Sequence, residues 1–341
     1  MEENQLSNQS TFIVYFSRIL SILLILLVLV LISYLCYFVY INTPRSPENL
    51  NFDINQENNS YSQIPTEVHQ FHPNMKFNHN NISYQINSDC SLNKKQRMVE
   101  AFNILSENVG LISFHEVSNY YELVDIEISC SESEKPSDNQ DTNQEKDFFI
   151  AGEGGAREII LSGKYNIIMN GTVLLFKSPE NSIKCEYPNV ELHELIHVFG
   201  FDHSEDKNSI MNPYLNSCDQ KLDVSIIDEL KRLYSIKNLP DLFFKEINAV
   251  KKGRYLDFNL TIKNEGLSDA KNVTFSIFDD NELVETSDIG ELKSGAGIFI
   301  KIINFKLLHL SSKQIVFKID NDNHIQELDK SNNVAEVKFK S

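Results

Sequence analysis

The longest apolar segment of the chain lies near its N-terminus. Residues 19–41 (ILSILLILLVLVLISYLCYFVYI) are 23 consecutive positions without a charged side chain. A helix of this length, rising about 1.5 Å per residue, spans roughly 34 Å and crosses a hydrocarbon core of about 30 Å. A cleaved signal peptide has a shorter apolar region of about 7–15 residues and a small-residue cleavage site. We therefore expect an uncleaved single-pass transmembrane helix at residues 19–41, after an N-terminal tail at residues 1–18. Three tyrosines of the kind that gather at membrane interfaces stand near its C-terminal end: Tyr34, Tyr37 and Tyr40.

The orientation of this helix is not decided by its flanking charges, because Arg18 and Arg45 balance each other. Four of the five cysteines follow the helix, an even number that suits disulfides in an oxidising compartment. Glycosylation sequons also follow it, at Asn58, Asn81, Asn170, Asn259 and Asn272. We expect a short tail inside the cell and everything after Pro44 outside the cytoplasm.

After the apolar helix the composition becomes polar and then periodic. Residues 42–80 are rich in Asn, Gln, Ser and Pro, which predicts a stalk or linker. From Ile82, apolar and polar positions alternate (ISYQIN), as in a strand. Ser91 is suited to cap the following helix. The apolar face of that helix is formed by Met98, Ala101, Phe102 and Leu105.

The patterns continue as short elements up to about residue 239. Further strands are expected at residues 112–117, 124–129 and 171–176, and a helix capped by Asp223 closes the region. Residues 131–147 carry no apolar side chain apart from a proline and predict a solvated loop. The glycine-rich segment AGEGGARE at residues 151–158 lacks the GK[ST] of a phosphate loop, and we interpret it as a backbone turn.

The last hundred residues have a different pattern. Short alternating runs are separated by turn signals, and they number six or seven between residue 241 and the C-terminus. This spacing is typical of a β-sandwich. We therefore divide the folded part into a first domain at residues 81–239 and an all-β domain at residues 240–341. The runs lie at 242–247, 256–262, 273–278, 298–305, 315–319 and 334–339.

Length and charge narrow the classes of partner. A chain of 341 residues suits about two domains. It has 31 Lys+Arg against 48 Asp+Glu, a formal net charge of −17, so no nucleic-acid partner is expected. Hydrophobic residues make up 41% of the chain, which is enough for packed cores and excludes wholesale disorder.

Residues 193–203 (HELIHVFGFDH) carry the strongest chemical signal. His193 and His197 are four residues apart, so on a helix their imidazoles share one face and can bind one metal. Gly200 can adopt the positive φ that ends the helix, and the turn brings His203 in as a third ligand. Three imidazoles leave a fourth position on Zn²⁺ for water, and Glu194 is placed to take a proton from it. We expect one catalytic zinc ion per chain.

This pattern resembles the metzincin zinc peptidases, whose signature is HExxHxxGxxH. Met211, in the sequence SIMNP, resembles the Met-turn of that clan, and Ser204 after the third ligand is similar to the matrixin branch. The tyrosine that astacins place two residues after the methionine is absent, because Pro213 stands there. The resemblance covers residues 82–235.

The resemblance implies an α+β catalytic domain with a twisted mixed sheet, a long ligand-bearing helix and an edge strand along the cleft. Residues 171–176 are our candidate for that edge, which would bind an extended peptide through main-chain hydrogen bonds. Glu194 would activate water and later protonate the leaving amine.

Two features depart from the matrixin pattern. The Pro-Arg-Cys-Gly segment that keeps matrixins latent is absent, and Cys36, within the apolar helix, is the only cysteine before Cys90. The acidic loop at residues 131–147 replaces a recognisable site for structural zinc and calcium. Only the catalytic zinc is therefore carried over from the family.

The four cysteines outside the apolar helix are candidates for two disulfides. Cys185 and Cys218 flank the zinc motif, while Cys90 precedes a helix and Cys130 ends a strand. We favour the pairs Cys185–Cys218 and Cys90–Cys130, although four cysteines allow three connectivities. A second zinc site is disfavoured because no CxxC spacing occurs.

The C-terminal domain resembles the CARDB type of immunoglobulin-like domain found in prokaryotic surface proteins. The resemblance rests on the start Asp241-Leu242, the turn Asn264-Glu265-Gly266 and the ending IQELDKSNN at residues 325–333. Such a domain suits binding of a surface protein or a glycan. Turn chemistry accounts for three oxygen-bearing residues that are also candidate calcium ligands: Asp320, Asp322 and Asn323.

Two functions from different classes follow. The first is a membrane-anchored zinc endopeptidase that hydrolyses peptide bonds of peptides or proteins outside the cytoplasm. The second is a catalytically silent adhesion or recognition protein in which zinc only stabilises the fold. Glu194 favours the first, because a structural zinc site needs no general base.

Overall fold

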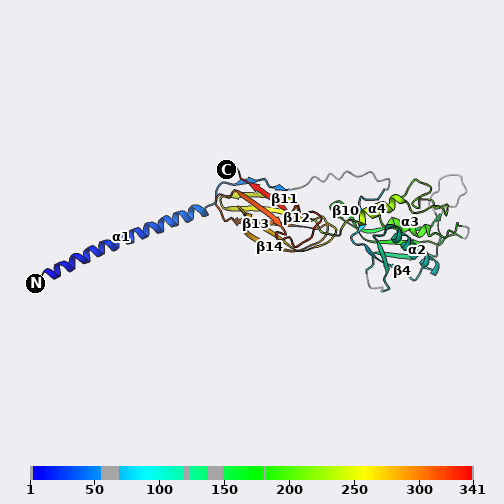
Figure 1. Cartoon of the computed structure of the whole chain (residues 1–341), viewed down its shortest axis with the longest axis horizontal. Helices are drawn as coiled ribbons and strands as arrows, with labels where there is room; N and C mark the ends of the chain where they lie inside the picture. Colours follow the sequence, from blue (N-terminus) through cyan, green and yellow to red (C-terminus); the bar gives the residue numbers. More distant parts are fainter. Residues whose placement is uncertain (1–2, 55–68, 119–122, 137–148, 180–181, 340–341) are drawn as a thin grey trace.

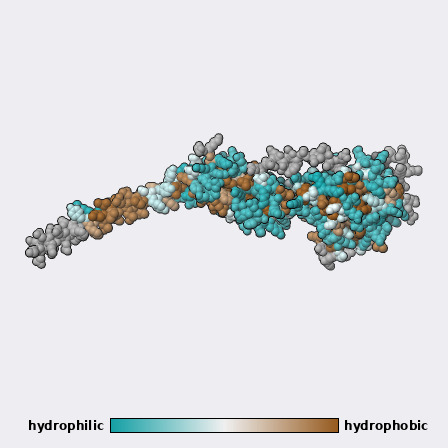
Figure 2. Space-filling model, viewed as in Figure 1, coloured by the Kyte–Doolittle hydropathy of each residue, from teal (hydrophilic) through white to brown (hydrophobic). Residues whose placement is uncertain are grey.

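The computed structural model describes residues 3–54, 69–118, 123–136, 149–179 and 182–339. Its first element is the helix α1 (Glu3–Asn42), of which Tyr15–Asn42 is long and apolar enough to cross a membrane. This segment packs against no other part of the protein, and Figure 2 shows it as a hydrophobic rod joined to a largely hydrophilic body.

The first folded domain is built on one mixed sheet. Its strands are arranged in the order β3-β10-β6-β4-β5, all parallel, and β9 pairs antiparallel with β10. Three helices accompany this sheet, which confirms the expected α+β class (Figure 1). The strands are β3 (Met75–Phe77), β4 (Asn81–Ile86), β5 (Ser113–Glu116), β6 (Ile126–Cys130), β9 (Gly152–Ser162) and β10 (Tyr165–Leu175); the helices are α2 (Leu92–Val109), α3 (Asn189–Val198) and α4 (Val224–Tyr234).

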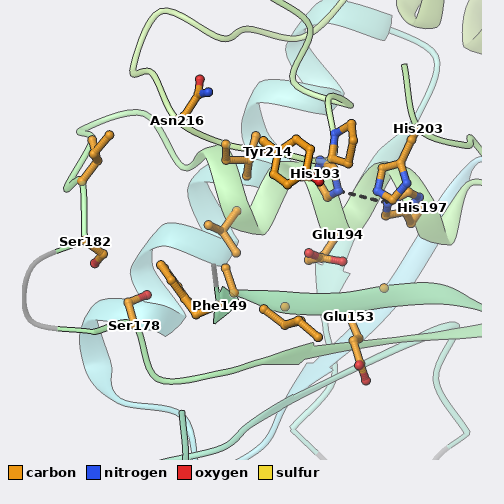
Figure 3. A pocket seen from close by; sticks show the side chains of 18 of the residues that line it. Phe149, Glu153, Ser178, Ser182, His193, Glu194, His197, His203, Tyr214 and Asn216 are labelled. Atoms are coloured by element: carbon orange, nitrogen blue, oxygen red, sulfur yellow. Dashed lines mark hydrogen bonds between the residues drawn. The ribbon is translucent and has the colours of Figure 1, made fainter. Parts of the chain in front are cut away.

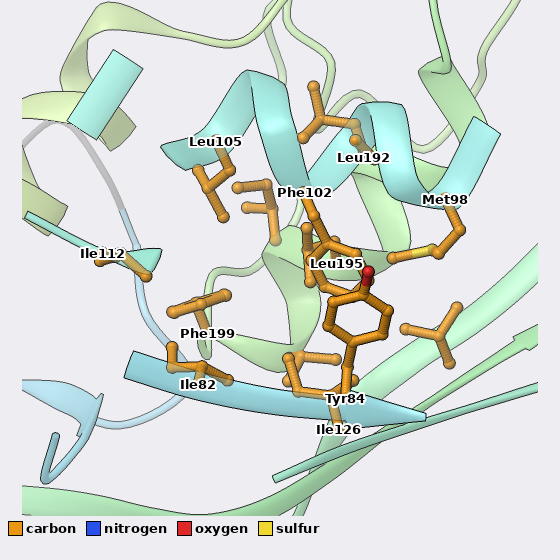
Figure 4. Close-up of a cluster of buried hydrophobic side chains, with 14 of the residues drawn as sticks. Ile82, Tyr84, Met98, Phe102, Leu105, Ile112, Ile126, Leu192, Leu195 and Phe199 are labelled. Atoms are coloured by element: carbon orange, nitrogen blue, oxygen red, sulfur yellow. The ribbon is translucent and has the colours of Figure 1, made fainter. Parts of the chain in front are cut away.

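The core of this domain lies between α2, α3 and the sheet (Figure 4). Ser91 caps α2 by accepting a hydrogen bond from the Lys94 N–H, and Gly110 ends the helix in the left-handed conformation. Phe102 of α2 stacks on Tyr84 of β4 with a centroid distance of 4.1 Å. Burying each such side chain contributes about 1.5–3 kcal/mol. The predicted apolar face of α2 is buried as a whole: Met98, Ala101, Phe102 and Leu105.

The glycine-rich segment at residues 151–158 is a strand, not a turn. It forms the first part of β9, which pairs with β10 over almost the whole length of both strands. The expectation that residues 171–176 form the sheet edge is therefore wrong, because β10 is enclosed by β9 on one side and by β3 and β6 on the other. Among the described strands β9 pairs only with β10, so β9 is the edge strand on this side of the sheet.

Two disulfides brace this domain. Cys90, just before α2, is bonded to Cys130 at the end of β6, and Cys185 is bonded to Cys218 on the two sides of the histidine motif. Closing loops of 40 and 33 residues stabilises the folded state by about 4 kcal/mol each in the chain-entropy account. Residues 137–147 of the predicted acidic loop lie outside the described residues. Its first part contains β7 (Lys135–Pro136), which pairs with β8 (Phe149–Ile150) just after the predicted loop.

The C-terminal domain is a β-sandwich, as expected. One sheet has the order β1-β11-β12-β15 and the other β14-β13-β16-β17-β2. Aromatic rings of both sheets meet in its core, for example Phe258 and Phe317 with centroids 5.0 Å apart. The strands are β1 (Glu48–Leu50), β2 (Asp53–Ile54), β11 (Leu242–Lys252), β12 (Tyr255–Asn264), β13 (Ala270–Asp279), β14 (Glu282–Leu292), β15 (Gly297–Lys306), β16 (Gln314–Ile319) and β17 (Val334–Lys338).

The candidate calcium ligands of this domain serve a turn. The carboxylate of Asp320 accepts the backbone N–H groups of His324 and Ile325 and pairs with Lys330 at 3.2 Å. These donors already satisfy its oxygens, so turn chemistry explains Asp320 without a cation.

Part of the predicted linker belongs to this sandwich. The strand β1 pairs with β11, and β2 pairs with β17, so residues 48–54 complete both sheets. Leu50 is buried, and Phe52 stacks on Phe317 at 4.6 Å. Because the chain threads the sandwich before it forms the first domain, the sandwich lies between α1 and that domain (Figure 1). The linker interpretation is thus wrong for residues 48–54, while residues 55–68 lie outside the described ranges.

The two domains are in contact near the boundary at residue 240. The Ser162 hydroxyl, at the end of β9, donates to the Gly266 carbonyl at 2.6 Å. Beside it, Tyr165 and Ile167 of β10 form a small buried cluster with Leu267 of the sandwich. The far end of the β9–β10 hairpin is therefore packed against the second domain.

Glu327, close to this boundary, is expected to make stability depend on pH. Burial raises its pKa from 4.5 to about 7, although Leu242 N–H and the Asn333 amide donate to it. Since the folded chain holds this proton more tightly, the stabilisation is complete below pH 4.5 and is lost as the pH rises through about 7. We expect Glu327→Gln to gain roughly 2 kcal/mol of unfolding free energy relative to wild type between pH 5 and 8, after allowing for screening. Denaturant unfolding of wild type and Glu327→Gln at pH 5 and at pH 8 measures this. The same difference in unfolding free energy between the two proteins at both pH values would contradict it.

Candidate metal centre

The helix α3 carries the first two histidines through the middle of the first domain. All but one of its ten positions are buried, so the helix has no solvent-exposed face and its polar side chains lie inside the domain. The helix ends at Val198, and Gly200 turns the chain with φ of 84°. A side chain at Gly200 would also collide with Met75, since a Cβ there would lie 2.4 Å from the Met75 Sδ. Glycine is therefore required both for the turn and for the close packing beneath it.

The turn brings the three predicted histidines together (Figure 3). The Nε2 atom of His197 lies 3.0 Å from that of His193 and 3.2 Å from that of His203. On the other side of the rings, the Nδ1 atoms of His193 and His197 each lie 2.7 Å from a backbone carbonyl, of Ile210 and Phe201. These carbonyls accept the Nδ1 protons, which leaves lone pairs on the Nε2 atoms.

This arrangement fits a metal ion better than any protein donor. Lone pairs that face one another at 3.0–3.2 Å repel unless a cation lies between them. With zinc–nitrogen bonds of about 2.0–2.1 Å, tetrahedral ligands are separated by roughly 3.3 Å, close to the observed spacing. Burial, then repulsion from the neighbouring imidazoles, lowers the pKa of His193 to about 3. Burial also lowers the pKa of His197, so both rings are in the neutral form at pH 7, which is the form that binds a metal ion.

Glu194 lies next to the imidazoles, and its side chain points toward β9, the strand that carries Glu153 (Figure 3). Its side chain is buried, and burial raises its pKa to about 8 despite a hydrogen bond from the Gly154 N–H. A cation held by the nearby imidazoles would favour its carboxylate form. The residue is thus placed to gain and lose a proton beside the histidine cluster.

The glycines of β9 allow this close approach. A Cβ at Gly152 would lie 2.6 Å from the Glu194 Cγ, and one at Gly154 would lie 2.1 Å from the Glu194 carbonyl oxygen. The glycine content of this segment therefore serves its packing against α3. From the sequence alone the same glycines suggest a backbone turn. Gly155 faces open space, with no atom within 4 Å of such a Cβ.

The segment after His203 forms a buried turn next to the histidine cluster. Met211 is fully buried, and its carbonyl accepts the Ser204 N–H at 2.8 Å. The Ser209 hydroxyl accepts the Met211 N–H and donates to Asp223, the residue before α4. Asp223 therefore fixes this turn rather than capping its helix, since its side chain makes no cap hydrogen bond.

The histidines open into a cleft of about 730 Å³. One wall is formed by β8 and the start of β9, and the other is the segment from Pro213 to Asn216. Phe71 lines the cleft and stacks on His197 with ring centroids 6.0 Å apart, a role that the sequence did not predict. The Phe71 N–H is held by the Gly200 carbonyl at 2.8 Å, so this part of the predicted linker is also built into the domain. The alternation of apolar and polar residues that marks other strands is absent there.

Comparisons with known proteins agree with this architecture. Residues 76–235 match the family model of the matrixins, and residues 239–337 match that of the CARDB domain. Similar solved structures include the CARDB domain of a Pyrococcus furiosus protein in complex with di-metal ions, 18% identical, covering 29% of this chain and 88% of that chain with a TM-score of 0.25. Another is a domain of a Methanosarcina acetivorans protein described as a cell surface protein, 21% identical, covering 30% and 94% with a TM-score of 0.24. A search of curated proteins finds no match.

Proposed function

We propose that the matrixin domain, which this chain carries in front of a CARDB domain, is a zinc-dependent endopeptidase. The observation that supports this most is the convergence of three imidazoles, with the His197 Nε2 atom 3.0 Å from that of His193 and 3.2 Å from that of His203, beside a buried carboxylate that is not one of the proposed ligands. His193, His197 and His203 would hold the ion. Such an ion supplies Lewis acidity, which lowers the pKa of a bound water and polarises a peptide carbonyl.

The residues of the chain would carry the proton transfers. Glu194 takes the proton of the attacking water and returns it to the leaving amine. Its burial between α3 and β9 keeps bulk water away and holds the carboxylate in one position. The Ile210 and Phe201 carbonyls hold the two helical imidazoles in the tautomer that a ligand needs.

The substrate would bind along β9. This strand has a free edge among the described strands, and its residues 152–154 line the cleft next to Glu194. An extended peptide can add to such an edge through main-chain hydrogen bonds, with its scissile bond facing the histidines. This mode of binding would select for extended peptide segments.

Metal content tests the ligand assignment. We expect His193→Ala to contain one zinc ion per chain fewer than wild type, because two imidazoles hold the ion far less tightly than three. Zinc per chain, measured by elemental analysis of the full chain in detergent, reports this. His115→Ala is the matched control, since His115 is exposed on β5, lies outside the histidine cluster and contacts the Asn81 side chain. Equal zinc in wild type and His193→Ala would remove the ligand assignment.

The second candidate function is a silent recognition protein whose zinc only stabilises the fold. Glu194 argues against it, because a buried carboxylate that is no ligand destabilises the fold unless it has another role. A zinc-loaded wild type that cleaves no peptide but loses stability when zinc is removed would favour this alternative.

We further propose that α1 anchors the protein in a membrane with both domains outside the cytoplasm. The length of its apolar segment and the two disulfides support this. The protein is then expected to stay in the membrane fraction after extraction with alkaline carbonate and to retain peptides from residues 1–42 in mass spectrometry. A soluble protein whose N-terminus begins after α1 would show that α1 is a cleaved signal.

A further inference from the structure

A second group of metal-binding side chains lies in the sandwich, away from the zinc-peptidase site. Asp279 ends β13, Asp280 follows it in the turn to β14, and His309 lies in the connection from β15 to β16. Their ligand atoms all lie within 4.8 Å of one another. The His309 Nδ1 is 3.4 Å from the Asp279 Oδ2 and 3.9 Å from the Asp280 Oδ2.

Two atoms of this group are buried without a hydrogen-bond partner. Asp279 is completely buried, with 0% of its surface exposed, and its Oδ1 has no donor. The His309 Nδ1 is likewise buried and has no hydrogen bond. An unsatisfied buried polar atom destabilises a fold by about 1–3 kcal/mol, and more when it carries charge. The His309 Nδ1 faces the other oxygen of Asp279, Oδ2, so a cation there would give Nδ1 a partner and would offset the charge of the buried carboxylate.

The backbone around the group holds its shape. The Asp279 Oδ2 accepts the backbone N–H of His309 at 2.8 Å, which ties the two residues together. The Asp280 Oδ1 accepts the N–H groups of Lys313 and Gln314 at 2.6 and 2.8 Å. Asp280 stands in the left-handed conformation with φ of 51°. Its other oxygen, Oδ2, faces His309 and is free of these turn contacts.

The lysine that interacts with these carboxylates does not lie between them and the imidazole. Lys251 at the end of β11 interacts electrostatically with Asp279 and Asp280. Its ammonium donates to the Leu310 carbonyl at 3.3 Å rather than to either carboxylate. A lysine therefore lessens the repulsion between the two carboxylates without filling the space between their oxygens and the imidazole.

We propose that Asp279, Asp280 and His309 form a site for a divalent transition-metal ion, with zinc as the ion that fits best. One imidazole nitrogen with two carboxylate oxygens suits zinc, whereas calcium takes six to eight oxygens. Bonds of about 2.0–2.2 Å place tetrahedral ligands roughly 3.3–3.5 Å apart, near the 3.4 and 3.9 Å that the group already shows. The ion would join the β13–β14 turn to the β15–β16 connection, which passes from one sheet to the other.

Zinc stoichiometry of the full chain tests this site. After loading with zinc and desalting in detergent, we expect two ions per chain in wild type and one in His309→Ala. Asp279→Asn and Asp280→Asn keep an oxygen for the backbone donors, so they test the ligands without removing the turn, and both should also lose one ion. His324→Ala is the control and should keep two, because His324 is exposed in the same domain.

The outcomes separate this site from the catalytic one. Wild type with one ion that is lost in His309→Ala but kept in His193→Ala would support the sandwich site and contradict the catalytic one. Wild type with one ion that survives His309→Ala, Asp279→Asn and Asp280→Asn would overturn the sandwich site. Should His309→Ala fail to fold, the two asparagine variants decide alone, since folded variants that keep both ions overturn the proposal.

Discussion

Replacing Glu194 by alanine is expected to lower the rate of peptide hydrolysis by about 10²–10⁴-fold while zinc binding is retained. The carboxylate is buried beside the three imidazoles, lies outside the group proposed to hold the ion, and is the proposed proton acceptor. Glu194→Gln should show the same loss, because it keeps the size of the side chain and removes only its basicity. The rate of cleavage of an extended peptide, measured by mass spectrometry together with zinc content, reports both effects.

The matched control for this experiment is Glu107→Ala. Glu107 is exposed on α2 and lies outside the cleft, so its loss should change the rate little. Equal rates in wild type and Glu194→Gln would show that Glu194 is not the base. Loss of zinc in Glu194→Gln would instead assign the residue to the ligand set.

Replacing Gly154 by alanine is expected to destabilise the catalytic domain by about 3 kcal/mol or more and to abolish activity. The added Cβ would lie 2.1 Å from the Glu194 carbonyl oxygen, a backbone atom of α3 that cannot rotate away. The strand β9 must then move away from α3, which separates the proposed peptide-binding edge from Glu194, the proposed general base.

Gly155→Ala provides a control in the neighbouring position. Its Cβ would meet nothing within 4 Å, so it should change the unfolding free energy by less than about 1 kcal/mol and leave the rate unaltered. Denaturant unfolding and peptide cleavage of both variants measure the difference. Two variants with the same stability would show that β9 does not pack against α3 as described.

The histidine cluster could be predicted from the sequence because its geometry is local. Spacing of four residues on a helix places His193 and His197 together, and a glycine turn returns His203 to the same point. The role of residues 151–158 could not, because glycine in a strand and glycine in a turn have the same composition. Only the packing of Gly152 and Gly154 against α3 distinguishes them, and that contact joins segments 40 residues apart.

The fold of each domain was also predictable, but not the path between them. Leu50, Phe52 and Ile54 alternate as in a strand, yet the surrounding polar residues obscured this short signal. The strand β14 was missed because most of its side chains are exposed and the alternation is weak. The group of Asp279, Asp280 and His309 combines a turn with a connection about 30 residues later, which no local spacing indicates.

The most direct test of the central claim is a metal-exchange assay of peptide cleavage by the full chain in detergent. We predict that a chelator abolishes cleavage and that zinc restores it once one ion per chain occupies the catalytic site. Magnesium should not restore cleavage. Cleavage that persists in fully zinc-free protein, or no cleavage of any extended peptide by the zinc-loaded wild type, would contradict the assignment of this domain as a zinc endopeptidase.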